Sequence, residues 1–176
     1  SQRPLSASWT VTGSGAFALG LNQKCRAHIT GMTPGRIVDY GLKDSMNMGA
    51  CMAPAAADTV ARHMEDFHVT PEEYDRIITG DLGSVGQTVL IDLLREKGID
   101  IADRHMDCGI EIFDAEAQDT HAGGSGCGCS AVTLAAYVLP KLESGEWKKV
   151  LFLPTGALLS KTSFNEGKSV PGIAHA

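Results

Sequence analysis

One stretch limits the possible folds of this chain more than any other: a glycine-rich run at residues 123–129, followed at once by an apolar segment. Four glycines and two cysteines lie in that run, and residues 131–142 are then apolar on nearly every side of a helix. A helix that lacks a polar face is buried between other layers of a protein. We therefore expect a buried central helix that starts at Gly126, bends or breaks near Pro140 and ends at Gly145.

Two further helices and a helical turn are predicted before that run. Over residues 49–67, apolar side chains recur at spacings of three and four, which places them on one helix face. The side chains of this face are Ala53, Ala57, Val60, Met64 and Phe67. Ser84 and Gln87 have the spacing of a capping box at the start of the second helix, and Thr70 with Glu73 predicts a short capped turn.

Strands are predicted between these helices. Ile77 and Ile78 indicate a short buried strand, and the apolar run at residues 149–156 indicates a central strand covered on both faces. Residues 8–21 and 24–32 predict strands before the first helix, and residues 109–113 have the composition of one more. This alternation of strands with helices favours an α/β fold whose sheet is at least partly parallel.

Composition argues against several classes of function. The chain has 176 residues, which suits one domain, and its formal net charge of −6 argues against a nucleic-acid partner. No apolar run approaches the roughly 18 residues that a transmembrane helix needs. The five cysteines are scattered and odd in number, which fits reduced thiols better than a disulfide framework.

The glycine-rich run has four interpretations. A phosphate loop is disfavoured because no lysine follows and because the glycine spacing differs from the dinucleotide fingerprint. A zinc site is disfavoured because one residue separates Cys127 from Cys129 and no second ligand pair has zinc-ribbon spacing. A reactive thiol is the third interpretation, since a helix N-terminus lowers the pKa of a cysteine and His121 could act as a base. We favour the fourth, close packing of backbone against backbone, with N–H groups that could hold a carboxylate.

Residues 79–84, with the sequence TGDLGS, are the second region of interest. They lie where a predicted strand ends and a helix begins, and ligands of open α/β sheets bind at the carboxyl ends of strands. Asp81 is therefore a candidate ligand contact or general base. The simplest interpretation is that it caps the turn that follows.

Four motifs resemble a known family. They are MAPAAADTVARHMEDF, YDRIITGDLGSVG, AGGSGCGCSAVTLAAYVLPKLESG and VLFLPTGALLS. Together they resemble the second half of the stage V sporulation protein AD (SpoVAD) family, which is similar in fold to thiolases and ketoacyl synthases. The resemblance implies that residues 1–176 are the C-terminal half of a longer protein with two similar halves. Each half would be a βαβαβαββ unit with a mixed sheet and a parallel core, and the two would stack as an αβαβα sandwich.

The resemblance also implies where catalytic residues would stand. Condensing enzymes of this fold use a nucleophilic cysteine from the first half, a histidine in one motif, and an asparagine or histidine in a later glycine-rich motif. In this chain Gly80 stands at the position of the histidine, and Ser125 stands at the position of the later asparagine or histidine. We therefore expect no general base and no enzymatic activity. The alternative is a thiolase-like or ketoacyl-synthase-like acyltransferase that uses Cys127 or a first-half cysteine.

The resemblance implies instead a binding protein for dipicolinic acid or its calcium chelate, which serves dipicolinate uptake into developing spores as a component of the SpoVA complex. The expected ligand contacts are Gly80, Asp81, Leu82, Gly83, Ser125, Gly126 and Cys127, with no resident cofactor or metal. Expected partners are the missing N-terminal half, other SpoVA membrane proteins and a second copy of the full-length protein, but no nucleic acid. The expected location is the forespore and spore, peripheral at the inner membrane.

Overall fold

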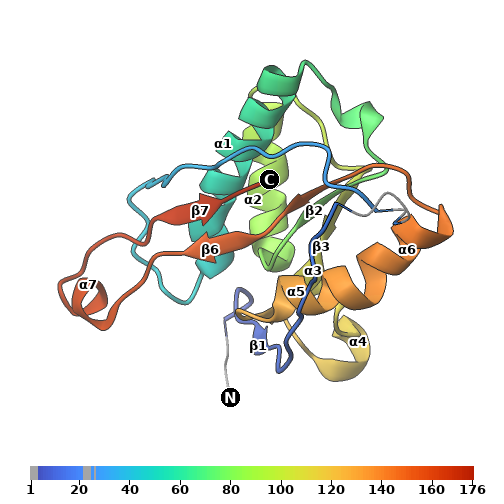
Figure 1. The fold of residues 1–176 in the computed structure, drawn as a ribbon. Coiled ribbons are helices and arrows are strands. Elements are labelled where there is room, and N and C mark those ends of the chain that lie inside the picture. The colour runs from blue at the N-terminus through green and yellow to red at the C-terminus, as the bar shows by residue number, and fades with distance from the viewer. Residues whose placement is uncertain (1–3, 22–24, 26) are drawn as a thin grey trace.

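The structure is a computed structural model that describes residues 4–21, 25 and 27–176. Helices cover both faces of a small sheet (Figure 1). The elements are, in chain order, β1 (Trp9–Thr10), α1 (Met48–Phe67), the 3₁₀ turn η1 (Pro71–Glu73), β2 (Arg76–Thr79), α2 (Gly83–Arg95), β3 (His105–Asp107), α3 (Cys108–Glu111), α4 (Ala115–Gln118), β4 (Gly124–Ser125), α5 (Cys129–Thr133), the π-helical turn η2 (Leu134–Val138), α6 (Leu139–Ser144), β5 (Val150–Leu153), β6 (Thr155–Ala157), α7 (Lys161–Asn165) and β7 (Gly172–Ala174).

Three parallel strands form the core of the sheet, in the order β3–β2–β5. Ile78 of β2 pairs with Met106 of β3 on one side and with Phe152 of β5 on the other. Strand β6 begins just past Pro154, where β5 has ended, and pairs with β7 in the antiparallel direction. The expected parallel core is confirmed, whereas the expected mixed sheet is not seen among the described residues, because the antiparallel β6–β7 pair forms a separate sheet. The expectation that residues 149–156 form the central strand is wrong, because β2 has a parallel neighbour on each side.

The chain before α1 extends the sheet beyond β7. Val38 and Gly172 exchange two backbone hydrogen bonds, and Thr33 and Ala176 exchange two more. Residues 33–38 therefore lie along the outer side of β7 in the antiparallel direction. The pairing is interrupted, which explains why only the Val38–Gly172 bridge is regular.

Two apolar clusters lie on opposite faces of the sheet. On one face α1 and α2 pack against Ile77 and Leu153, and on the other the helix formed by α5, η2 and α6 packs against Ile78 and Phe152 (Figure 1). Alternate residues of a strand point to opposite faces, so β2 and β5 each contribute to both clusters. The molecule is a three-layer α/β structure, which confirms the fold class. The resemblance to thiolases stays a prediction.

Helix α1 buries most of its predicted face. Ala53, Ala57, Val60 and Met64 are all buried, as expected. Phe67 is not, and 42% of its surface is exposed. The reason is its place as the last residue of α1, where its ring stacks on His63 at a centroid distance of 4.6 Å instead of entering the core.

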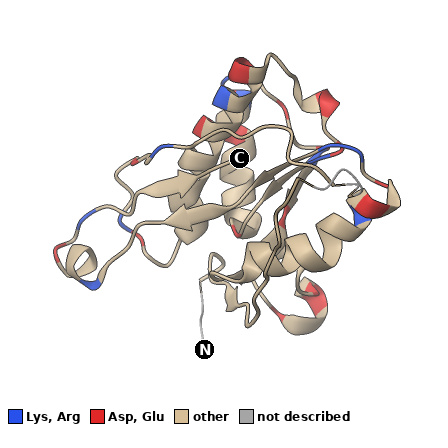
Figure 2. Ribbon diagram, viewed as in Figure 1, with Lys and Arg blue, Asp and Glu red and all other residues tan. Residues whose placement is uncertain are grey.

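The predicted central helix forms, but it starts at Cys129 and not at Gly126, and Pro140 neither breaks it nor ends it. The helix continues through α6 to Ser144, and Gly145 ends it with a φ of 79°. Proline lacks an N–H donor, and the turn directly before it is π-helical, with the Leu139 N–H bonded to the Leu134 carbonyl. The expected burial on nearly every side is wrong, because Ala135, Ala136 and Tyr137 are exposed. None of these three residues is charged (Figure 2), but the Lys141 ammonium lies 4.9 Å from the centre of the Tyr137 ring.

Several predicted strands are absent from the described residues. Of residues 8–21, only Trp9 and Thr10 form a strand, because β4 offers an edge just two residues long. In the range 24–32, residues 25 and 27–32 form no strand, and residues 24 and 26 lie outside the described residues. Residues 109–113 begin in helix α3 because Asp107 caps its first turn.

Candidate functional site

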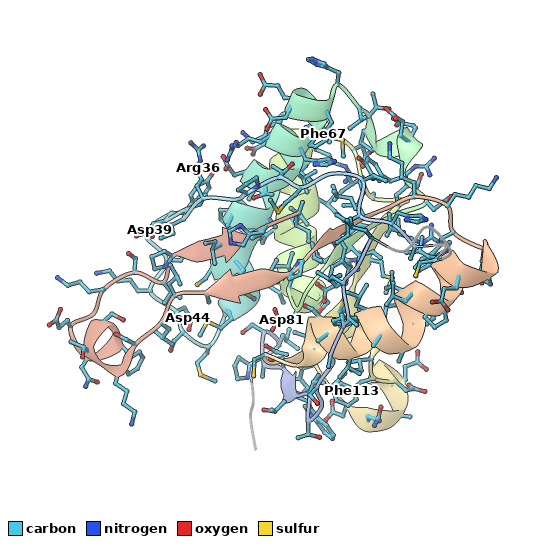
Figure 3. The ribbon with its side chains drawn as sticks, viewed as in Figure 1. Arg36, Asp39, Asp44, Phe67, Asp81 and Phe113 are labelled. Atoms are coloured by element: carbon cyan, nitrogen blue, oxygen red, sulfur yellow. The ribbon has the colours of Figure 1, made fainter. Side chains whose placement is uncertain are left out.

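The site expected at the end of β2 is centred on the carboxylate of Asp81. This residue lies in the loop between β2 and α2, near the start of the α5 helix (Figure 3). Its Oδ2 accepts hydrogen bonds from the Ser125 hydroxyl at 2.7 Å and the Gly126 N–H at 3.1 Å, and its Oδ1 accepts one from the Thr155 hydroxyl at 3.1 Å. One carboxylate therefore joins three segments that are far apart in the sequence. The sequence analysis named Asp81, Ser125 and Gly126 but not Thr155.

The other predicted ligand contacts lie beside these residues in the sequence and differ in their exposure to solvent. Leu82 is 2% exposed and packs in the core, whereas Cys127 is exposed. Several N–H groups that we expected to face a ligand already have partners within the chain. The Asp81 N–H donates to Thr155, the Gly126 N–H to Asp81, and the N–H groups of Leu82 and Gly83 to Asp107.

Asp107 is a functional candidate that the sequence analysis missed. It is 1% exposed, at the end of β3, and its carboxylate accepts five hydrogen bonds. The donors are the Thr79 hydroxyl and the N–H groups of Leu82, Gly83, Gly109 and Ile110. Burial raises the pKa of Asp107, and the bonds from Thr79, Gly83 and Leu82 act against that rise.

This carboxylate replaces the capping box that we predicted at the start of α2. No side chain of the N-terminal residues of α2 caps the helix, so the prediction for Ser84 and Gln87 is wrong. The Gln87 side chain bonds instead to Nδ1 of His105 at 2.8 Å. By contrast, the capping box of Thr70 and Glu73 is present and its prediction is confirmed.

His105 belongs to the same hydrogen-bond network as Asp107 and Gln87. Its Nε2 lies 3.0 Å from the Thr79 hydroxyl, which donates to Asp107 at 2.6 Å, so Nε2 must be the donor to Thr79. Nδ1 then accepts from Gln87. Burial lowers the pKa of His105 to about 4, so the ring is neutral at neutral pH and both of its nitrogens are engaged.

Two glycines of the site allow the close packing that we favoured. A side chain at Gly128 would come within 2.0 Å of the Gly13 carbonyl oxygen, and one at Gly80 within 2.7 Å of the Thr155 nitrogen. Glycine is therefore required where the N-terminal segment crosses the start of α5 and where β2 passes β6. The interpretation of the glycine-rich run as close backbone packing is confirmed at Gly128.

The thiols and His121 do not form a catalytic pair in this part of the structure. Burial raises the pKa of Cys129 to about 12, with Asp81 and Asp107 adding to the effect, and its thiol approaches the Gly80 carbonyl. The expected lowering of its pKa by the helix N-terminus is therefore wrong. His121 lies near the Pro4 carbonyl and Asp119 instead of near a thiol.

The described ranges contain neither a cluster of metal ligands nor a membrane-spanning helix. No group of three His, Cys, Asp or Glu side chains is placed to hold a metal ion there. None of the helices in those ranges combines the length and hydropathy needed to cross a bilayer. A cavity of about 710 Å³ lies away from Asp81, between residues 27–31, the end of α1 and residues 147–151, and none of the predicted contacts lines it.

Comparison with known proteins gives the family. The model of the stage V sporulation protein AD (SpoVAD) family matches residues 1–176. The chain belongs to the SpoVAD family. It is 42% identical over 174 residues to stage V sporulation protein AD of Bacillus subtilis (strain 168), an alignment that covers 99% of the chain and 51% of the relative. The chain thus spans about half the length of this SpoVAD relative, and family membership supports a role in sporulation.

Proposed function

We propose that the chain forms part of a non-catalytic protein that binds dipicolinate as its calcium complex, for uptake into the developing spore. The observation that carries the proposal is the Asp81 carboxylate at the carboxyl edge of β2, held by Ser125, Gly126 and Thr155. Ligands of open α/β sheets bind at this edge. The family supports the sporulation context.

The site favours the calcium complex over the free dianion. The N–H groups of Gly126, Leu82 and Gly83 already serve carboxylates of the chain, so they are not free to bind the carboxylates of a ligand. Asp81 would repel a free dianion, whereas a carboxylate oxygen is a preferred ligand of calcium. Dipicolinate supplies two carboxylate oxygens and its ring nitrogen to the ion, so Asp81 and water molecules would fill the remaining positions of a calcium ion that takes six to eight ligands.

The acid–base groups near the site support a binding role over acyl transfer. His105 has both ring nitrogens hydrogen-bonded, and the high pKa of Cys129 keeps its thiol protonated. A general base must reach the proton that it removes, and a nucleophilic cysteine must be a thiolate. Incubation of the full-length protein with an acyl-CoA, followed by mass spectrometry, tests the alternative. A covalent adduct on a cysteine would favour the acyltransferase.

We further propose that the full-length protein acts at the spore inner membrane beside other SpoVA proteins. In this proposal the exposed face at Ala135, Ala136 and Tyr137 packs against the other half of the protein. None of these three side chains is charged, as is typical of the buried core of an interface. We also propose a second copy of the full-length protein as a partner. The acidic composition does not favour nucleic acid as a partner.

Calorimetric titration of the full-length protein tests the proposed function. We expect calcium dipicolinate to bind more tightly than free dipicolinate, and both more tightly than benzoate. The substitution Asp81→Asn should weaken calcium dipicolinate about tenfold, because the anionic ligand of calcium is lost. Ser125→Ala is the matched comparison: it removes one hydrogen bond to Asp81 but keeps the carboxylate, so it should weaken binding by less than Asp81→Asn does. Binding no tighter than that of benzoate would contradict the proposal.

A further inference from the structure

We infer that Asp107 is a positioning residue of this site, which sets Asp81 against Ser125 without touching the ligand. The inference rests on the proposed function, since it concerns the same site. It starts from the observation that the Asp107 carboxylate holds both ends of the loop that carries Asp81. Oδ2 accepts from the Thr79 hydroxyl at 2.6 Å, before the loop, and from the Leu82 N–H at 2.9 Å, after it.

The loop is therefore fixed at both ends by a single oxygen atom. Oδ1 adds a bond of 3.1 Å from the Gly83 N–H, the first residue of α2. Only Gly80 and Asp81 lie between these anchors, so the direction of the Asp81 side chain depends on the position of Asp107. Carboxylate bonds to backbone N–H groups are charge-assisted and shorter and stronger than neutral ones.

The same carboxylate also fixes the opposite side of the site. Oδ1 accepts from the Gly109 N–H at 3.0 Å and the Ile110 N–H at 3.3 Å, which caps α3. A side chain at Gly109 would lie 2.1 Å from the Gly124 carbonyl oxygen, so the start of α3 is in direct contact with β4. Ser125, which donates to Asp81, is the next residue of β4. Asp107 thus links the two segments that the Asp81–Ser125 bond joins.

The side chains that bond to Thr79 orient the hydrogen bond from Thr79 to Asp107, which is the shortest that Asp107 accepts. The Thr79 hydroxyl accepts from His105 Nε2, so its own proton points to Asp107. His105 is held in turn by Gln87 of α2. The side chains of Thr79, His105 and Gln87 bond to one another and to Asp107, whereas that of Ser125 bonds to Asp81, so the positioning residues and the ligand contacts belong to separate sets of hydrogen bonds.

The test uses four full-length proteins: wild type, Asp107→Asn, Asp81→Asn and the double variant. An asparagine keeps the shape of Asp107 but replaces one of its two acceptor oxygens by an NH2 donor, so the anchors on that oxygen are lost and the remaining bonds are no longer charge-assisted. We expect Asp107→Asn to weaken calcium dipicolinate about tenfold in the wild-type background and by less than twofold in the Asp81→Asn background. This non-additivity is expected of a residue that acts through Asp81. An equal effect in both backgrounds, or no effect, would overturn the inference.

Two additions keep the test independent of folding and of the proposed function. Asp114→Asn is the matched control, since Asp114 caps α4 through the N–H groups of Glu116 and Ala117 but is remote from Asp81 in the hydrogen-bond network, and it should leave the binding unchanged. Amide hydrogen exchange of Gly126 reports its bond to Asp81 without any ligand. We expect faster exchange in Asp107→Asn than in Asp114→Asn, and equal rates would overturn the inference. If wild type fails to bind dipicolinate, the proposed function fails, while the exchange rates still decide the role of Asp107.

Discussion

At the scale of single residues, the fold depends on positions where no side chain fits. Gly80 is one of them, because a Cβ atom there would lie 2.7 Å from the Thr155 nitrogen and 2.7 Å from the Ser130 hydroxyl. We expect Gly80→Ala to lower the free energy of unfolding by about 1–3 kcal/mol, the usual cost of overpacking. Urea unfolding measures it. Gly20→Ala is the control, because a Cβ atom at Gly20 would meet no neighbour. Gly98→Ala is less informative, because the positive φ of Gly98 would itself strain an alanine. Equal stability of Gly80→Ala and Gly20→Ala would contradict the packing.

His105 provides a pH-dependent prediction at the same scale. Its pKa falls from 6.5 in the unfolded chain to about 4 in the folded one, so the unfolded state binds the proton first as the pH falls. The stability that depends on neutral His105 is therefore complete above about pH 6.5 and is lost on acidification towards pH 4, by up to about 3 kcal/mol.

Urea unfolding of wild type and His105→Gln at pH 7 and pH 4 checks this prediction. Wild type should lose more stability than the variant over that range. His63, whose pKa is also lowered by burial, contributes to both proteins and cancels in the comparison. The same pH dependence in both proteins would show that His105 is not held neutral by the fold.

At the scale of elements, two predicted capping boxes had different outcomes, and the difference can be measured. The pair of Thr70 and Glu73 caps η1, whereas Ser84 lies in the first turn of α2 without capping it. We expect Thr70→Ala to cost about 1 kcal/mol, the typical value for a lost cap, and Ser84→Ala to change stability by less than about 0.5 kcal/mol. Thermal or urea unfolding of the two variants decides it, and a larger effect of Ser84→Ala would contradict the structure.

This outcome also shows what the sequence could and could not predict. Long apolar periodicity identified α1 and the α5–η2–α6 helix, and the glycine signal at Gly145 fixed the end of the latter. The contact of Asp107 with the start of α2 could not be found, because β3 has three residues and no alternation, and because α2 begins 24 positions earlier in the chain, at Gly83. Asp81 was found because it directly follows a buried strand. Long-range carboxylate caps leave no local spacing to detect.

At the scale of the whole molecule, the exposed apolar face of the central helix is expected to be covered in the full-length protein. We expect Ala135→Lys to destabilise the full-length protein by about 2 kcal/mol or more, because a charge would be placed in a buried interface, and to leave residues 1–176 alone unchanged. Ala117→Lys, at an exposed position of α4, is the control and should be neutral in both. An equally small effect of both lysines on the full-length protein would argue against a partner on this face.

The most direct test of the central claim is a crystal structure of the full-length protein with calcium dipicolinate. The account predicts calcium within 2.3–2.6 Å of an Asp81 carboxylate oxygen, the usual calcium–oxygen distance, with the dipicolinate ring at the carboxyl edge of β2. Ser125 and Thr155 should still donate to Asp81. A ligand bound elsewhere, or an imidazole within proton-transfer reach of a thiolate at this edge, would contradict the account.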